Sequence, residues 1–232
     1  IAGARGYDKS IEGVANDCEF VVVKLSPSPN FTKTHLENGI SNVLTYTLSE
    51  IMAGIEFISR TAISKNRPVV IILSTGSTEE SHDGNIIFTR YLNTLASNRS
   101  TAIICGFGNQ GSANGHASAI LNNMGETKSS ELSIPREMKH LTFRVWCRKP
   151  GKTAINIISP SGQNSQFIMP KIRVYRTIKY VKENTTLDVS IFTPEAITGN
   201  QMIVLEFSDI KPGIWTIQLK SQHDDSFKYD IW

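Results

Sequence analysis

The stretch best suited to chemistry is Gly-Phe-Gly-Asn-Gln-Gly, from Gly106 to Gly111. Its central Asn109 carries a side-chain amide, and a fixed amide donor can stabilise an oxyanion that develops during a reaction. The flanking glycines allow the backbone to turn sharply and a ligand to approach closely. Asparagine also tolerates a left-handed turn. The residues alone therefore leave open whether Asn109 has a catalytic or only a structural role.

The elements around this stretch alternate between strand and helix. Apolar, β-branched runs at 19–25, 69–73 and 101–105 predict three buried strands. Apolar residues at steps of three and four predict an amphipathic helix over 44–62, and a second helix is predicted over 85–97. Strands that alternate with helices form parallel sheets with right-handed crossovers. An α/β fold is therefore expected for this part of the chain.

A second small polar turn, Ser74-Thr75-Gly76, follows the predicted strand 69–73. Parallel strands end at the same edge of a sheet, so this turn and the turn at Gly108-Asn109 are expected to lie together. Open α/β sheets bind their ligands at that edge. The sequence therefore predicts a cleft between the two turns.

The pattern changes after about residue 125, which predicts two domains, 1–125 and 126–232. The second part contains short segments with strand character, separated by turns such as Lys149-Pro-Gly151 and Lys211-Pro-Gly213. These segments are 141–147, 153–158, 171–181, 186–192, 202–207, 214–219 and 227–232. Short strands at this spacing predict an antiparallel β-sandwich or jelly roll.

Composition narrows the class of protein. The formal charge of +3 on 232 residues is too small to indicate nucleic-acid binding. No apolar run has the length that a membrane-spanning helix needs. Cys18, Cys105 and Cys147 lack metal-ligand spacing, so we expect buried free thiols and no metal site. No residue pattern calls for a cofactor.

Five landmarks in order resemble the subtilisin-like serine proteases, or subtilases. They are Ile1-Ala-Gly3, Glu12-Gly-Val-Ala15, Gly54-Ile-Glu-Phe57, the run from Val70 to Gly76, and Gly108-Asn-Gln-Gly111. The chain departs from the family pattern at three of its positions, where Asn16 replaces Pro, Thr75 replaces Leu and Gln110 replaces Glu. Each landmark is weak alone, and it is their order and spacing that carry the resemblance.

A narrower resemblance is to the clostridial subtilases, which include the Csp spore-germination proteases. It rests on Arg5-Gly-Tyr-Asp-Lys9, Ser81-His-Asp-Gly84 and Asn114-Gly-His-Ala117. Some members of that group carry a jelly-roll insertion between the oxyanion-hole Asn and the catalytic Ser. The resemblance places residues 126–232 at that insertion, and it implies an extracellular or spore-associated protein.

The resemblance also implies an activity, the hydrolysis of peptide bonds, and a set of site residues. Asn109 would be the oxyanion-hole residue. Ser74, Thr75 and Gly76 would form a wall of the substrate cleft, and Phe107 and Gly108 the floor of the specificity pocket. The expected partner is a peptide or protein substrate.

The family's catalytic triad is not expected in this chain, because neither His-Gly-Thr nor Gly-Thr-Ser occurs. His82 and His116 are expected to be structural. We therefore expect a fragment of a longer protease that is inactive alone and self-associates through exposed sheet edges. Two alternatives remain: a catalytically dead relative that binds peptides or partners, and a β-sandwich module that binds carbohydrate or protein. Exposed tryptophans would favour the module, and buried ones a structural insertion.

Overall fold

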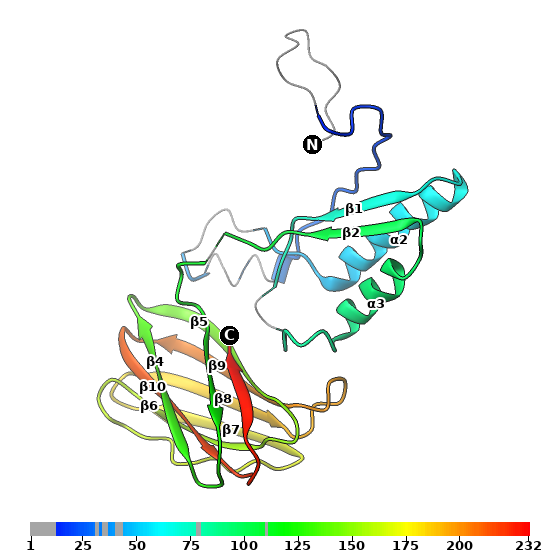
Figure 1. Ribbon diagram of the computed structural model, residues 1–232. Coiled ribbons are helices and arrows are strands. Elements are labelled where there is room, and N and C mark those ends of the chain that lie inside the picture. Colours follow the sequence, from blue (N-terminus) through cyan, green and yellow to red (C-terminus); the bar gives the residue numbers. More distant parts are fainter. Residues whose placement is uncertain (1–12, 31–32, 34–36, 40–43, 78–79, 110) are drawn as a thin grey trace.

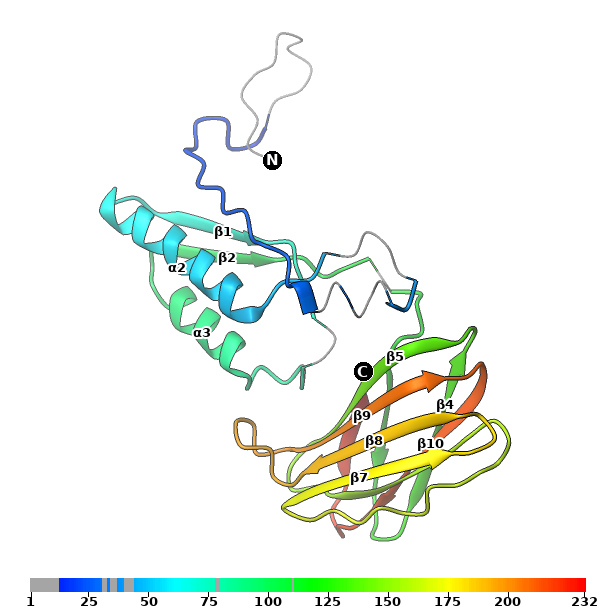
Figure 2. The same ribbon diagram turned by 180° about the vertical axis from the view of Figure 1, so that it is seen from behind.

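The computed structural model describes residues 13–30, 33, 37–39, 44–77, 80–109 and 111–232 (Figure 1). Its first part contains a parallel pair of strands, β1 (Val69–Leu73) and β2 (Thr101–Cys105). Two helices, α2 (Leu48–Ser64) and α3 (Ile87–Ala96), lie together on one face of this pair (Figures 1 and 2). The predicted alternation of helix and parallel strand is therefore confirmed for these four elements.

Helix α2 begins and ends where its sequence dictates. The Thr47 hydroxyl accepts from the Glu50 N–H, and the Glu50 carboxylate accepts from the Thr47 N–H, which forms a capping box. The helix ends at Lys65, and Asn66 follows with a φ of 52°. Such a left-handed residue after the last turn is a common helix terminator.

The predicted strand over 19–25 is wrong. The segment is extended, but no described residue of it belongs to a sheet. Its side chains alternate, so that Val23 packs near Gly54 of α2, while Val22 is 83% exposed. β-Branched side chains favour extended backbone, but a strand also needs a hydrogen-bonded neighbour. None of the described residues supplies one here.

Burial of β1 and β2 also differs from the prediction of fully buried strands. Ile71 is buried beneath the helices, whereas Val70, Ile72 and Ile104 on the opposite face are more than half exposed. The parallel register pairs Val70 with Ala102 and Ile72 with Ile104, so these residues share one face. This apolar face of the strand pair is open to solvent in the described part of the chain.

The second part consists of two antiparallel sheets, as predicted. The six-stranded sheet has the order β3-β11-β5-β9-β8-β7, and the three-stranded sheet has the order β4-β10-β6 (Figure 1). The strands are β3 (Ala117–Leu121), β4 (Thr127–Ile134), β5 (Met138–Cys147), β6 (Thr153–Ile158), β7 (Arg173–Tyr180), β8 (Thr185–Phe192), β9 (Gln201–Ile210), β10 (Gly213–Ser221) and β11 (Phe227–Ile231). Both sheets contribute side chains to one hydrophobic core. We call residues 117–231 the β-rich part.

Three aromatic rings organise that core. The Trp215 ring meets Tyr180 and Phe207 edge to face, with centroids 5.0 and 5.4 Å apart. The polar atoms of these rings are satisfied, because the Trp215 indole donates to the Lys211 carbonyl and the Tyr180 hydroxyl to the Ile157 carbonyl. Because these N–H and O–H groups are hydrogen-bonded, burying them costs little free energy, and their fixed partners favour one packing arrangement.

Strands β3 and β4 were not predicted from the sequence. β3 pairs with β11, and β4 pairs with β10, both antiparallel. β4 contains Ser129, Ser130 and Ser133, whose small polar side chains hide the alternation of an amphipathic strand. The sheet thus begins before residue 126, and the division into domains 1–125 and 126–232 stays a prediction.

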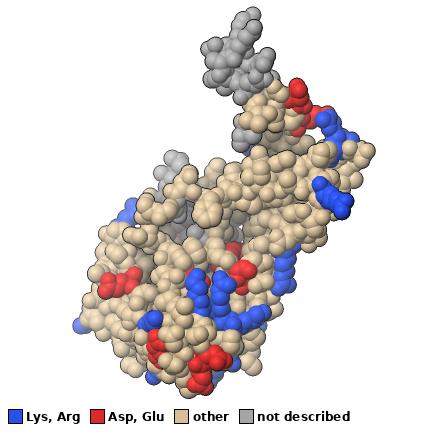
Figure 3. Space-filling model, viewed as in Figure 1, with Lys and Arg blue, Asp and Glu red and all other residues tan. Residues whose placement is uncertain are grey.

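On the face of the molecule that Figure 3 shows, charges of both signs are interspersed over the β-rich part. Neither α2 nor α3, nor any other helical segment described, combines the length and hydropathy that crossing a bilayer requires.

Candidate functional site

The two polar turns leave the same edge of the parallel pair, as predicted. Leu73 and Cys105 end β1 and β2 in direct register. One more hydrogen bond follows them, from the Gly106 N–H to the Leu73 carbonyl at 2.8 Å. Because of this bond, Ser74-Thr75-Gly76 and the Gly106–Asn109 turn start side by side.

The turn that carries Asn109 depends on a glycine. Gly108 has a φ of +81°, a conformation that residues with a Cβ adopt at a cost. Asn109 follows directly and is exposed, and none of the described residues forms a hydrogen bond with its side-chain amide. Gln110 lies outside the described residues. An exposed amide after a glycine turn is chemically able to donate to a ligand oxygen.

The other predicted site residues surround this edge without forming a closed cleft. Ser74, Thr75 and Gly76 are exposed, and Phe107 is fully exposed. A Cβ built at Gly76 or Gly108 would meet no atom within 4 Å. The roles of these residues as cleft wall and pocket floor therefore remain predictions.

Asp83, in the loop after β1, joins the two parts of the molecule. Its carboxylate accepts from the Ser81 hydroxyl, the Asn85 N–H and the Asn200 amide at 2.6, 3.0 and 2.8 Å. Partial burial alone would raise the pKa of Asp83, but these hydrogen bonds outweigh it and lower that pKa to about 2. Asn200 lies 117 residues further along the chain.

Both histidines near the edge have structural contacts. The Trp232 ring lies next to His82 and His116, with ring centroids 4.1 and 3.7 Å apart. His116 Nε2 also lies 3.0 Å from Asp230, whose carboxylate pairs with Lys228. These contacts agree with the expected structural role of the two histidines. No sequence pattern indicated that Trp232 lies against them.

The structure of this chain, a parallel pair followed by a β-rich part, is similar to the solved structure of the CspB protease of Clostridium perfringens. The TM-score is 0.73 and the sequence identity is 18%. The match covers 84% of this chain and 42% of that chain, so this chain spans less than half the length of that protein. No family model matches the sequence, and no curated protein does.

The likeness to the CspB protease extends over both parts of the molecule, since neither part alone makes up 84% of the chain. The chain thus has part of the fold of that subtilase. At 18% identity, the match establishes the fold and not the activity. The predicted α/β sheet followed by an antiparallel β-rich part is confirmed.

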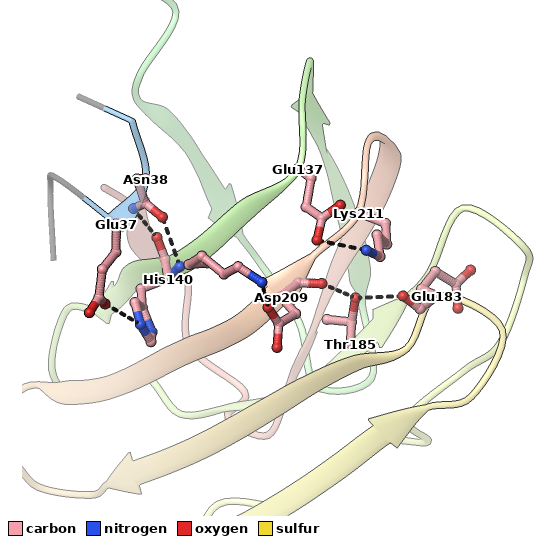
Figure 4. Close-up of polar contacts among 9 residues, drawn as sticks. Glu37, Asn38, Glu137, His140, Glu183, Thr185, Asp209 and Lys211 are labelled. Carbon is pink, nitrogen blue, oxygen red and sulfur yellow. Dashed lines mark hydrogen bonds and ion pairs between the residues drawn. The ribbon is translucent and has the colours of Figure 1, made fainter. Parts of the chain in front are cut away.

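A second connection between the two parts was not foreseen from the sequence (Figure 4). The Asn38 amide donates to the His140 carbonyl, and its oxygen accepts from the His140 N–H at 2.9 Å. One side chain thus satisfies both backbone groups of a residue on β5, as a neighbouring strand would. The His140 ring also lies 3.0 Å from Glu37.

The cysteines differ from the expectation of buried thiols. Cys147 is fully buried, and burial raises the pKa of its thiol to about 12 despite a contact with Thr153. Cys18 and Cys105 are exposed: the segment that follows Cys18 forms no strand, and Cys105 is the last residue of β2. In the part of the chain that the structure describes, no group of three or more potential metal ligands occurs.

Proposed function

We propose that this chain supplies the oxyanion hole and a cleft wall of a longer subtilisin-like serine endopeptidase. The observation that carries the proposal is the bond from Gly106 to Leu73, which starts the Asn109 turn and the Ser74–Gly76 turn at one sheet edge. The fold shared with the CspB protease supports it.

In this function, the Asn109 amide donates to the oxygen of the tetrahedral intermediate formed during peptide-bond cleavage. Removing one such donor typically costs about 3–4 kcal/mol of transition-state stabilisation. The backbone of Ser74, Thr75 and Gly76 pairs with an extended peptide, as an added strand does. Phe107 and Gly108 form the floor of the specificity pocket. The nucleophile and base come from other segments of the longer protein, so the isolated chain is inactive.

The test is an Asn109→Ala substitution in the longer protein, assayed with a chromogenic peptide. We expect kcat to fall by about 10²–10³ while KM changes little, since the oxyanion exists only in the transition state. Asn98→Ala is the matched control, because Asn98 is also exposed and lies at the opposite end of β2. Equal activity of the two variants would show that Asn109 has no catalytic role.

The alternative is a catalytically dead relative that binds a peptide or partner at the same edge. A fluorophosphonate probe distinguishes the two, because it labels only an activated serine nucleophile. Labelling of the longer protein supports the protease. A folded protein that is neither labelled nor hydrolytic, yet binds extended peptides, supports the alternative.

For the β-rich part we propose a stabilising role. Trp146 and Trp215 are 5% and 0% exposed, so they cannot form an exposed platform for a sugar. The contacts of Asn38 and Asp83 with this part hold it against the rest of the molecule. Deleting residues 117–231 from the longer protein should increase its unfolding rate, measured by fluorescence after a jump into denaturant. An unchanged rate would refute the role.

A further inference from the structure

A basic cavity of about 310 Å³ lies in the β-rich part, apart from the edge that carries Asn109. It forms where the turn from β5 to β6, the loop after β8 and the segment after β10 meet. Lys149, Lys152 and His223 line it, and none of its lining residues is acidic.

The two lysines are not neutralised by carboxylates. The Lys149 ammonium donates to the Thr198 carbonyl at 3.4 Å, which leaves further N–H groups for a ligand. Lys152 forms no ion pair with any residue that the structure describes. Two acidic residues lie beside the lining. The Asp225 carboxylate lies 3.9 Å from His223 and is 80% exposed, and the Glu195 carboxylate accepts from the Thr198 N–H and hydroxyl.

His223 adds a hydrogen-bond donor. Its Nδ1 accepts from the Asp225 N–H at 3.1 Å, so the neutral ring carries its proton on Nε2. The backbone of His223 is fixed by the Ser221 hydroxyl, which donates to its carbonyl at 2.8 Å and accepts from its N–H at 3.2 Å. The ring thus has a defined place beside the cavity.

Thr193 is a buried polar residue of the cavity lining. It lines the cavity and is only 8% exposed, yet its hydroxyl has no hydrogen-bond partner among the described residues. Buried hydroxyl groups are nearly always paired. The hydroxyl oxygen itself is inaccessible to solvent, so it makes no direct contact with an occupant of the cavity.

The cavity walls are rigid. A Cβ at Gly151 would lie 2.1 Å from the Phe227 ring, so only glycine fits there. The Gln201 amide accepts from the Thr153 N–H at 2.7 Å and donates to its carbonyl at 2.9 Å. A preformed site of this kind lowers the entropic cost of binding.

We propose that this cavity binds a small organic anion, in which a phosphate or carboxylate is attached to a sugar-sized body. The lysines and His223 would bind the anionic group, and the volume accommodates more than a bare ion. This site does not depend on the proposed protease function, since it uses none of the residues at the Asn109 edge.

The test is calorimetric titration of the 232-residue chain with glucose 6-phosphate, glucuronate, inorganic phosphate and glucose. We expect saturable binding of glucose 6-phosphate or glucuronate, with Kd below about 1 mM, and no binding of glucose. The ligand with the lower Kd shows whether the site prefers a phosphate or a carboxylate. If inorganic phosphate binds as tightly as glucose 6-phosphate, the proposal that the site recognises a sugar-sized body is wrong. If neither sugar anion binds saturably, the proposed site does not exist.

Substitutions locate the binding. Lys149→Met with Lys152→Met should weaken the binding about tenfold or more, because the two cations that line the cavity are lost. Lys179→Met with Lys182→Met removes the same charge from two equally exposed positions that do not line the cavity, and it should have little effect. Equal weakening by both lysine pairs would mean non-specific attraction and would overturn the proposal.

Discussion

Trp232 and His116 stack, with ring centroids 3.7 Å apart and an angle of 14° between the ring planes. His116 directly precedes β3 and Trp232 directly follows β11, and these strands are paired so that Ala117 lies opposite Ile231. The stack therefore joins the point where the chain enters the β-rich part to the point where it leaves. His82 contacts the same indole and links this junction to the loop after β1.

Trp232→Ala should destabilise the chain by about 2–4 kcal/mol, because a large ring that contacts His82 and His116 is replaced by a methyl group. The free energy of unfolding is measured by urea titration followed by circular dichroism. Ile214→Ala is the control, since Ile214 is 55% exposed and should change stability by less than about 1 kcal/mol. Equal effects of the two substitutions would contradict a role for the stack.

The contact between Asp83 and Asn200 should be sensitive only to strong acid. The pKa of Asp83 is lowered from 3.8 to about 2 in the folded chain, so its carboxylate stabilises the fold fully above about pH 4. That contribution is lost as the pH falls from 4 to 2. Asp83→Asn should therefore cost about 1–2 kcal/mol at pH 7 and progressively less below pH 4.

The measurement for Asp83 is urea unfolding of both proteins at pH 7, 4, 3 and 2.5. Asp224→Asn, at an exposed position without a hydrogen bond to the other part, serves as the control. A stability difference between Asp83→Asn and the unchanged chain that stays constant from pH 7 to pH 2.5 would argue against the depressed pKa.

The three thiols should react at different rates. Cys18 and Cys105 are exposed and should react rapidly with a disulfide reagent at pH 8, whereas Cys147 is buried with a pKa of about 12. Since the thiolate is the reactive form, Cys147 should react only when denaturant is added. The absorbance of the thiol that the reagent releases gives the number of cysteines that have reacted. With Cys18→Ser and Cys105→Ser combined, the rapid phase should disappear, and its persistence would refute the burial of Cys147.

The chain should self-associate through the open apolar face of β1 and β2. Val70, Ile72 and Ile104 are 59%, 54% and 54% exposed on this face, and a second copy would remove them from water. Sedimentation velocity should show dimers or larger species that become monomeric with Ile72→Lys and Ile104→Lys. Val181→Lys, at an 82% exposed turn position, should not change the association. A monomer at all concentrations would contradict this.

Where a sequence pattern is strong, it predicted the fold closely. The runs 69–73 and 101–105 match β1 and β2, and the helical period over 44–62 matches α2 with a shift of a few residues. The failures have physical causes. The segment 19–25 has the composition of a strand but no partner, and β4 is a strand whose serines conceal its alternation.

The site was predictable only in part. The parallel arrangement of β1 and β2 was enough to place Ser74 and Asn109 at one edge. No sequence pattern indicated the pairing of Asn38 with His140, 102 residues away, or of Asp83 with Asn200. Such contacts depend on single polar side chains, which leave no periodic pattern in the sequence.

The pairing of β3 with β11 also has a consequence for folding. His116 and Asp230 are 114 residues apart in sequence, yet they are joined by a hydrogen bond. Once the β-rich part has formed, the segments on either side of it are separated by about one strand spacing. The entropy of closing that long loop has then already been lost within the β-rich part. When the β-rich part forms, it brings the segments on either side of it close together. Contacts between those segments then become nearly local, which favours folding of the β-rich part first.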